Sequence, residues 1–289
     1  MTKHPYNLPV VIFSVCFLVL KISNSQGIDF SSHAFSKSNF FQVQSFADGP
    51  SSETVLQLCD SLRTELQKVW IAKQGPQTWE PRCEVILHRS RDSYSKAVGP
   101  GSSSTNGSSL VQLKSGVISK RRIDLMLDQQ GTLTSLPHEL THVILADCFK
   151  GRQPPLWLDE GIAMLADTHE KQLLHERDCM EAVSSKSAIT MEELVKLDRF
   201  SSSNQVAAFY GQSLALVRLL THRKSPDSLI EFANDSIDRG IATALKCHYD
   251  IDGVCELERQ WKNEVETFHS SRRRLPITGY NTVIIKPKI

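Results

Sequence analysis

The sequence predicts an α+β fold, and three observations lead to that prediction. Segments with the composition and alternation of β-strands all lie in the first half of the 289-residue chain. In the second half, apolar residues recur mainly at helical spacing. Between the two halves lies a short, largely apolar helical segment that contains two histidines and a glutamate. Strands early and helices late are typical of the α+β class, so we expect a small mixed N-terminal β-sheet with helices and a mostly helical C-terminal half.

The N-terminus has the pattern of an export signal. An apolar run at 8–20 follows two basic residues and is too short to span a bilayer comfortably. Small residues then predict cleavage before Gln26, so residues 1–25 are interpreted as a signal peptide. An uncleaved anchor is the alternative, because Lys21 ends the run abruptly. We therefore expect an exported protein, secreted, periplasmic or envelope-associated, with no membrane span in the mature form unless the signal is retained.

The rest of the first half alternates between strand and helix patterns. Residues 26–39 are polar and lack periodicity, so they are expected to form a flexible lead. The glycine- and serine-rich segment 100–109 is expected to be a loop. The last strand of this half alternates cleanly if Asp124 faces solvent. The predicted strands are 40–46, 83–88, 110–113 with 117–118, and 123–127, and the predicted helices are 52–71 and 92–98.

Helices are expected throughout the chain after the central segment. Two prolines precede a helix at 156–167, and Thr190 with Glu193 has the pattern of a capping box. A polar tail at 270–289 ends the chain, and its arginine run is more typical of a solvated or sorting segment than of a binding patch. Further helices are expected at 204–222, 225–233, 240–248 and 254–269.

Charge and cysteine usage limit the classes of function. The net charge is +1 with acids and bases interspersed, so no nucleic-acid partner is expected. One of the seven cysteines lies in the signal, and the remaining six are an even number in a chain expected to be exported. This favours disulfides, and only Cys247 with Cys255 is suggested by proximity. Six buried free thiols are the alternative.

The central segment contains the motif HELTH, with His138, Glu139 and His142. Histidines four residues apart on a helix lie on one side, about one turn apart, so both rings can approach one point. Zn²⁺ binds imidazole nitrogens readily and keeps a position for water when the protein supplies three ligands. Glu139 would reach that water as a general base. Structural histidines are the alternative, but a glutamate on an apolar helix is costly to bury without a metal or partner.

A zinc site of this kind needs a third protein ligand. The next acidic candidates on an apolar element lie in 157–167, which includes Asp159 and Glu160. The intervening residues leave room for the first helix to end, cross a loop with Gly151 and two prolines, and return.

At this point the sequence resembles the gluzincin metallopeptidases, whose ligands are HExxH plus a glutamate on a following helix. The stretch WLDEGIA at 157–163 is similar to the WLNEGFA stretch of aminopeptidase N-like enzymes, with Asp159 where asparagine usually stands. A closer resemblance is to the peptidase MA-like family of exported or envelope-associated bacterial proteins, which have a zincin-like domain. The resemblance covers the predicted domain at 40–269, and its matching pieces are 138–142, 157–163, 210–213 and 257–261.

The resemblance implies a role for individual residues. His138, His142 and Glu160 align with the ligands of one Zn²⁺ per chain, and Glu139 aligns with the catalytic base. Tyr210 lies at a plausible place for the tyrosine that, in related gluzincins, hydrogen-bonds the developing oxyanion. An ordinary packed tyrosine is the alternative.

Two aspartates are candidates to orient a ligand histidine. Asp159 lies beside the third ligand and Asp147 follows the HExxH segment. The sequence does not decide between them.

One departure from the family pattern limits the predicted activity. Aminopeptidase N-like enzymes carry a GAMEN-type segment that binds the free amine of the substrate, and nothing between Ser95 and Ser135 resembles it. The resemblance therefore implies a zinc peptidase that is not an aminopeptidase and acts on a peptide or protein, with the strand just before the metal helix as the docking edge. The alternative is a catalytically silent, zinc-containing peptide-binding or scaffold domain.

Overall fold

The structure is a computed structural model that describes residues 34–71, 78–99, 102–149, 151–198 and 205–273. The predicted signal peptide and most of the predicted lead and tail lie outside these residues. The chain divides into two compact units, which we call the sheet unit (1–69 and 73–144) and the helical unit (70–72 and 145–289). Among the described helices, none is both long and apolar enough to cross a membrane.

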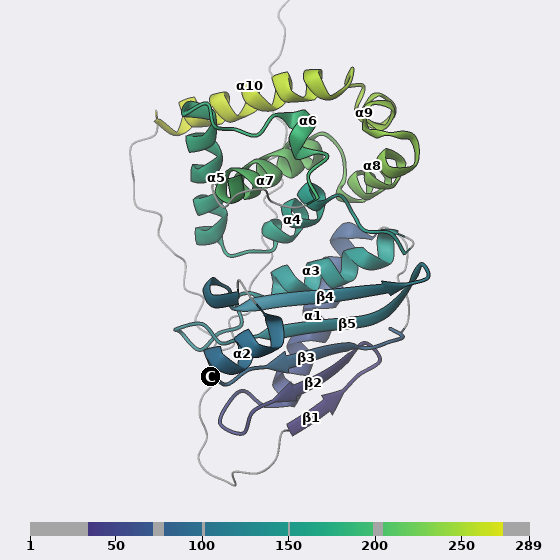
Figure 1. Ribbon diagram of the computed structural model, residues 1–289, viewed down its shortest axis with the longest axis vertical. Coiled ribbons are helices and arrows are strands. Elements are labelled where there is room, and N and C mark those ends of the chain that lie inside the picture. Colours follow the sequence, from purple (N-terminus) through teal and green to yellow (C-terminus); the bar gives the residue numbers. More distant parts are fainter. Residues whose placement is uncertain (1–33, 72–77, 100–101, 150, 199–204, 274–289) are drawn as a thin grey trace, which may run out of the picture. The chain divides into compact units, whose positions relative to one another are not determined.

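The sheet unit is built on a five-stranded mixed sheet in the order β1-β2-β3-β5-β4 (Figure 1). The three central strands β2, β3 and β5 are parallel to one another, whereas β1 and β4 pair antiparallel at the two edges. The predicted α+β class is confirmed. The strands are β1 (Ala34–Lys37), β2 (Phe41–Ser45), β3 (Cys83–Leu87), β4 (Gly107–Lys114) and β5 (Val117–Leu125).

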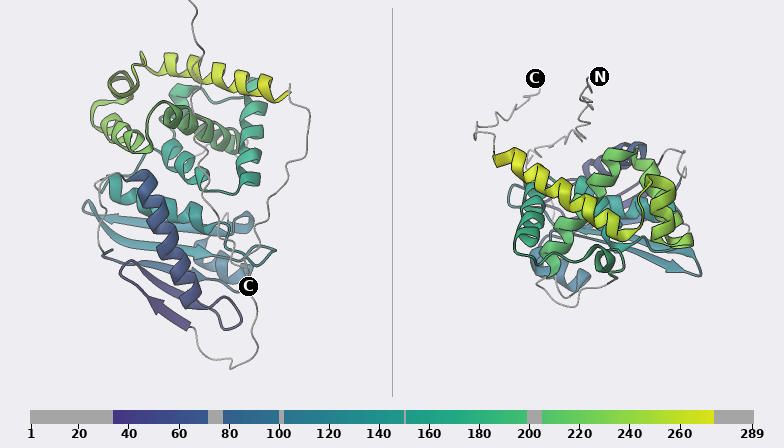
Figure 2. Two further views of the ribbon diagram at one scale, coloured as in Figure 1. Left: turned by 180° about the vertical axis from the view of Figure 1, so that it is seen from behind. Right: turned by 90° about the horizontal axis from the view of Figure 1, so that it is seen from above.

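Helix α1 (Ser52–Trp70) crosses one face of this sheet (Figure 2). Strands β2 and β3 alternate between buried and half-buried residues, which is the pattern of a sheet with one face on the core. The other helices of this unit are α2 (Arg91–Val98), the short 3-10 helix η1 (Ser102–Ser104) and most of α3 (Leu136–Ala146). The buried side chains that α1 contributes are Val55, Leu56, Cys59 and Leu66.

Two parts of the sheet differ from the sequence prediction. Strand β1 lies inside the segment predicted to be a flexible lead, and its Phe35 is 52% exposed. A short edge strand buries too little apolar surface to show a clear pattern. The strand fragments predicted between residues 110 and 127 belong to one hairpin of β4 and β5. The turn of this hairpin, at Ser115 and Gly116, has left-handed backbone angles.

The prediction that Asp124 faces solvent is wrong. Asp124 is only 5% exposed, and His88 and Arg122 both donate hydrogen bonds to its carboxylate. The alternation of apolar residues along β5 shows which face is buried, but it cannot show that a polar side chain finds partners on a neighbouring strand. The carboxylate is tolerated in the interior because these partners satisfy it.

The helical unit contains no strand among its described residues. Its α4 and α5 each pack on α7, and α10 runs along α5, α6 and α7 (Figure 1). The predicted capping box of Thr190 and Glu193 at the start of α6 is confirmed. The elements are η2 (Asp147–Phe149), α4 (Leu156–Leu165), α5 (His169–Ser184), α6 (Met191–Leu194), α7 (Val206–Arg223), α8 (Pro226–Arg239), α9 (Ile241–Tyr249) and α10 (Val254–Arg273).

The cysteines do not form the predicted disulfides in this structure. Five of the described cysteines, Cys59, Cys83, Cys179, Cys247 and Cys255, are free thiols. Cys59, Cys83 and Cys179 are fully buried, so they pack as small apolar side chains. Cys247 and Cys255, the pair suggested by proximity, are exposed near the facing ends of α9 and α10.

Candidate metal site

Helix α3 carries the two histidines of the HELTH motif. Its apolar residues form a buried side that fixes the rotation of the helix. The rings of His138 and His142 lie on the other side, with centroids 5.0 Å apart and planes at 74°, and both side chains are half-buried. The four-residue spacing of the histidines thus brings both imidazole rings to the same side of the helix, as expected. The completely buried residues of the helix are Leu136, Leu140, Thr141, Val143 and Leu145.

Helix α4 carries Glu160. The helix begins after Pro155 and buries Trp157, Leu158 and Ile162 in the helical unit. Gly161, the residue next to Glu160, allows α4 to approach α7 closely. A methyl group at Gly161 would lie 2.5 Å from Val217 Cγ2 and 2.7 Å from the backbone oxygen of Ser213. This close approach fixes the register of α4 on α7 and with it the position of Glu160.

His138, His142 and Glu160 are a possible metal-binding trio. One ligand atom from each residue, an imidazole nitrogen or a carboxylate oxygen, lies within 4.8 Å of the other two. In a tetrahedral zinc site with bonds of about 2.0–2.2 Å, ligand atoms are about 3.4 Å apart. Two imidazoles and a carboxylate are a donor set that fits Zn²⁺ and leaves a position for water.

Glu139 lies on α3 between the two histidines and is 9% exposed. Its side chain packs against the backbone of Gly107, at the start of edge strand β4. A Cβ atom at Gly107 would lie 2.8 Å from Glu139 Cγ and 2.9 Å from its carboxylate oxygen Oε1. The carboxylate therefore lies directly over this glycine.

Helix α2 supports the segment that leads into β4. Arg91 donates hydrogen bonds to the carbonyl oxygens of Ser102 and Thr105 and, over 2.6 Å, to Asn106 Oδ1. The hydroxyl of Tyr94, a fully buried residue, is 2.9 Å from Thr105 Oγ1. The pKa of Tyr94 is raised, first by burial and also by the negative charges of Glu139 and Asp124, although Thr105 and Arg91 oppose the shift. Tyr94 is thus a neutral neighbour of the glutamate.

A second cluster of buried polar side chains lies at the ends of β3 and β5. His88 Nε2 donates to Asp124 Oδ1 over 2.6 Å, and His88 Nδ1 lies 2.8 Å from Ser93 Oγ on α2. Desolvation would raise the pKa of Asp124, but the hydrogen bonds from His88 and Arg122 lower it overall. The ring of His88 also packs edge-on against Tyr94, with centroids 5.7 Å apart. Sequence analysis missed this group, because its members meet only through strand pairing and no local pattern links them.

Tyr210 lies in the first turns of α7 and is half-buried. Its ring packs on that of His175 of α5, with centroids 5.8 Å apart and planes at 38°. His175 was not identified from the sequence, because α5 was not predicted: it is charged over most of its surface and buries only Cys179 and Ala182 completely. The role of Tyr210 as an oxyanion donor stays a prediction.

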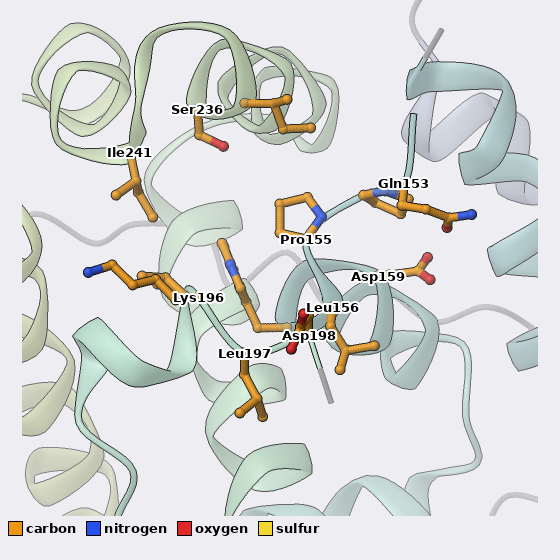
Figure 3. A pocket seen from close by; sticks show the side chains of 13 residues that line it. Gln153, Pro155, Leu156, Asp159, Lys196, Leu197, Asp198, Ser236 and Ile241 are labelled. Atoms are coloured by element: carbon orange, nitrogen blue, oxygen red, sulfur yellow. The ribbon is translucent and has the colours of Figure 1, made fainter. Parts of the chain in front are cut away.

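The two aspartates proposed to orient a histidine occupy different elements. Asp147 begins η2 directly after α3, and Asp159 lies on α4 next to Glu160. The side chain of Asp159 lines a cavity of about 580 Å³ in the helical unit (Figure 3). Most of the other lining residues are apolar, among them Pro155, Leu156, Leu197 and Ile241. A choice between Asp147 and Asp159 stays open.

Comparison with known proteins does not identify the site, so its class is described from its residues. No protein-family model and no curated protein matches this chain. The geometry defines the class of site. Two histidines on one helix and a carboxylate on a second helix form a set of ligands suited to a metal ion, and a further glutamate lies between the histidines in sequence.

Proposed function

We propose that this protein is a zinc-dependent hydrolase of peptide bonds that acts outside the cytoplasm. The observation that carries the proposal is the trio of His138, His142 and Glu160, with Glu139 on the same helix as the two histidines. These residues match, in type and order, the gluzincin pattern that the sequence resembles. The predicted export signal supports the location, and it lies outside the described residues.

Each residue of the site has a defined part in this proposal. His138, His142 and Glu160 would hold one zinc ion, which when bound supplies a Lewis acid for a carbonyl and for water. Glu139 would accept a proton from the attacking water and pass it to the leaving amine. Its burial and its contact with Gly107 favour a fixed carboxylate, which is the condition for efficient proton transfer.

The edge of the sheet offers a place for an extended peptide. The strand expected to serve as the docking edge is β5, but β5 lies between β3 and β4 and both of its edges are occupied. Strand β4 is one of the two edge strands, and among the described residues only β5 pairs with it. Because β4 begins at the residue that touches Glu139, a peptide paired with its outer edge would run past the general base.

A scaffold that binds zinc and peptides without turnover is the second candidate. The same trio and the same strand edge would serve it. It does not account for Glu139, because metal binding alone does not require a buried carboxylate between the two histidines. The presence of this residue favours the enzyme.

The decisive experiment compares the wild type with Glu139→Gln and Glu160→Ala. For each protein we would measure zinc by elemental analysis and cleavage of a peptide library before and after chelation. The Gln side chain keeps the shape of glutamate but cannot accept the proton, so Glu139→Gln should retain zinc and lose hydrolysis by several orders of magnitude. Glu160→Ala should lose most of the zinc.

Other outcomes would reject parts of the proposal. Full zinc content in Glu160→Ala would move the third ligand elsewhere. Activity that survives in Glu139→Gln would point to a contaminating protease. A wild type that binds zinc and peptides but cleaves none would support the scaffold.

A further inference from the structure

We propose that Gly107 is a positioning residue for Glu139, and that the enzyme requires glycine at this position to hold the general base in place. The inference rests on the proposed function, since it assigns Glu139 the role of base. It concerns a residue of the edge strand β4 that has no side chain and so cannot take part in the reaction itself.

The requirement for glycine at 107 comes from space and not from backbone conformation. The backbone of Gly107 is outside the left-handed region, so any amino acid could adopt it, unlike Gly116 in the hairpin turn with φ of 75°. What forbids a side chain is its surroundings. A Cβ at Gly107 would lie 2.7 Å from Ser135 Cβ, 2.8 Å from Glu139 Cγ and 2.9 Å from Glu139 Oε1, all closer than real Cβ contacts allow.

Gly107 cannot easily move away from α3, because the chain on both sides of it is fixed. Gly107 pairs with Leu125 in the β4–β5 ladder, and the Met126 amide donates to the carbonyl of Asn106 over 2.8 Å. The segment before it is held by the Arg91 hydrogen bonds and by the Tyr94 hydroxyl. A side chain at 107 would therefore press on Glu139 and on Ser135, just before α3, and not move the strand.

The contact limits Glu139 at two points along its side chain, Cγ and Oε1. A glutamate in solution samples several rotamers, and a fixed base must give up that freedom. The backbone of Gly107 limits, on one side, the positions that the Glu139 carboxylate can occupy. Displacing a catalytic group by about 1 Å can reduce the rate about 10²-fold, so a methyl group here should have an effect of that size.

The test is Gly107→Ala, with Gly116→Ala as the matched control. Gly107→Ala should lower kcat about 10²-fold with KM and zinc content unchanged, because the added methyl group displaces the base. In Gly116→Ala the added methyl group meets nothing within 4 Å, but the backbone becomes strained. This control should lose some stability in the same hairpin and keep full activity. A crystal structure of Gly107→Ala should show the Glu139 carboxylate displaced.

The double variant Gly107→Ala, Ser135→Gly keeps the test usable if the single variant folds poorly. It removes the contact with Ser135 Cβ and leaves both contacts with Glu139, so kcat should stay low. Normal kcat in a folded Gly107→Ala or in the double variant, with the carboxylate in its original place, would overturn the inference. A wild type without hydrolytic activity would reject the proposed function instead, and the carboxylate position in the crystal would then decide the inference by itself.

Discussion

Two glycines, one in each unit, lie beside the two glutamates of the candidate site and differ in what surrounds them. Gly107 in the sheet unit faces the side chains of Ser135 and Glu139. Gly161 in the helical unit faces the backbone of Ser213 and the branched side chain of Val217. Both sites are too tight for a methyl group. Only at Gly107 is a glutamate of the candidate site, Glu139, among the neighbours that must yield.

The difference shows how the same substitution can separate catalysis from stability. A flexible side chain such as Glu139 can rotate away at a small energetic cost, so the effect falls on its position. Helix backbone cannot rotate away, so a clash at Gly161 has to push α4 and α7 apart. We therefore expect activity to be the sensitive property of the sheet unit near β4, and stability with metal binding to be the sensitive property of α4.

The largest effect on stability is expected from Gly161→Ala. Alanine gains about 1 kcal/mol of helix propensity, but overpacking against backbone should outweigh it and leave a net loss of about 3 kcal/mol. Urea denaturation measures the loss, and elemental analysis should show reduced zinc because Glu160 moves with α4. Adding Val217→Ala removes the 2.5 Å contact but not the one with the Ser213 oxygen, so recovery should be partial. Unchanged stability and zinc would remove the contrast between the two glycines.

A smaller effect is expected from Asp124→Asn in the sheet unit. Loss of the charge in the bonds from His88 and Arg122 should cost about 2 kcal/mol at neutral pH. The pKa of Asp124 is lowered in the fold, so its stabilisation is fully present above the unfolded value of about 3.9 and is lost as pH falls through the lower folded value. Denaturation of wild type and variant from pH 7 to pH 2 should therefore converge in acid.

Glu65→Gln is the matched control for this carboxylate. Glu65 pairs with Lys68 on the exposed surface of α1, with 59% of the glutamate side chain accessible. Exposed pairs of this kind contribute little, so no measurable change is expected. A gap between wild type and Asp124→Asn that does not narrow as the pH falls would mean that the charge of Asp124 is not what stabilises the fold.

The smallest effect is expected for the chemical modification of the cysteine thiols. This experiment compares how accessible the thiols of the two units are. Both described cysteines of the sheet unit, Cys59 and Cys83, are completely buried, and burial is the main reason that their pKa values are raised. Iodoacetamide should leave them unmodified in the native protein, because alkylation needs an exposed thiolate. Cys247 and Cys255 in the helical unit are exposed and should react first. Mass spectrometry of the native, unreduced protein counts the modified residues.

The thiol experiment also tests the disulfides predicted from the export signal. If Cys247 and Cys255 are modified only after reduction, these two cysteines form a disulfide in the purified protein. If they react without a reductant, they are free thiols, as in the structure. Rapid modification of Cys59 or Cys83 would contradict the closed interior of the sheet unit.

The sequence alone was sufficient wherever the relevant geometry is local. The four-residue spacing of His138 and His142 places both rings on one side of α3, because helix geometry repeats over that distance. The capping box at Thr190 is equally local. The HELTH segment and the apolar stretch around Glu160 could both be recognised without coordinates, but their assignment to one candidate site came from the resemblance to the gluzincin pattern.

Only the tertiary structure decided which distant residues meet. The contact of Glu139 with Gly107 depends on β4 being the edge strand, and the burial of Asp124 depends on β3 pairing with β5. Neither pairing leaves a trace in the residues nearby, because strands that are far apart in sequence are brought together by the packing of the whole sheet. The sequence therefore determined which residue types form the candidate site, and the fold decided which backbone lies against Glu139.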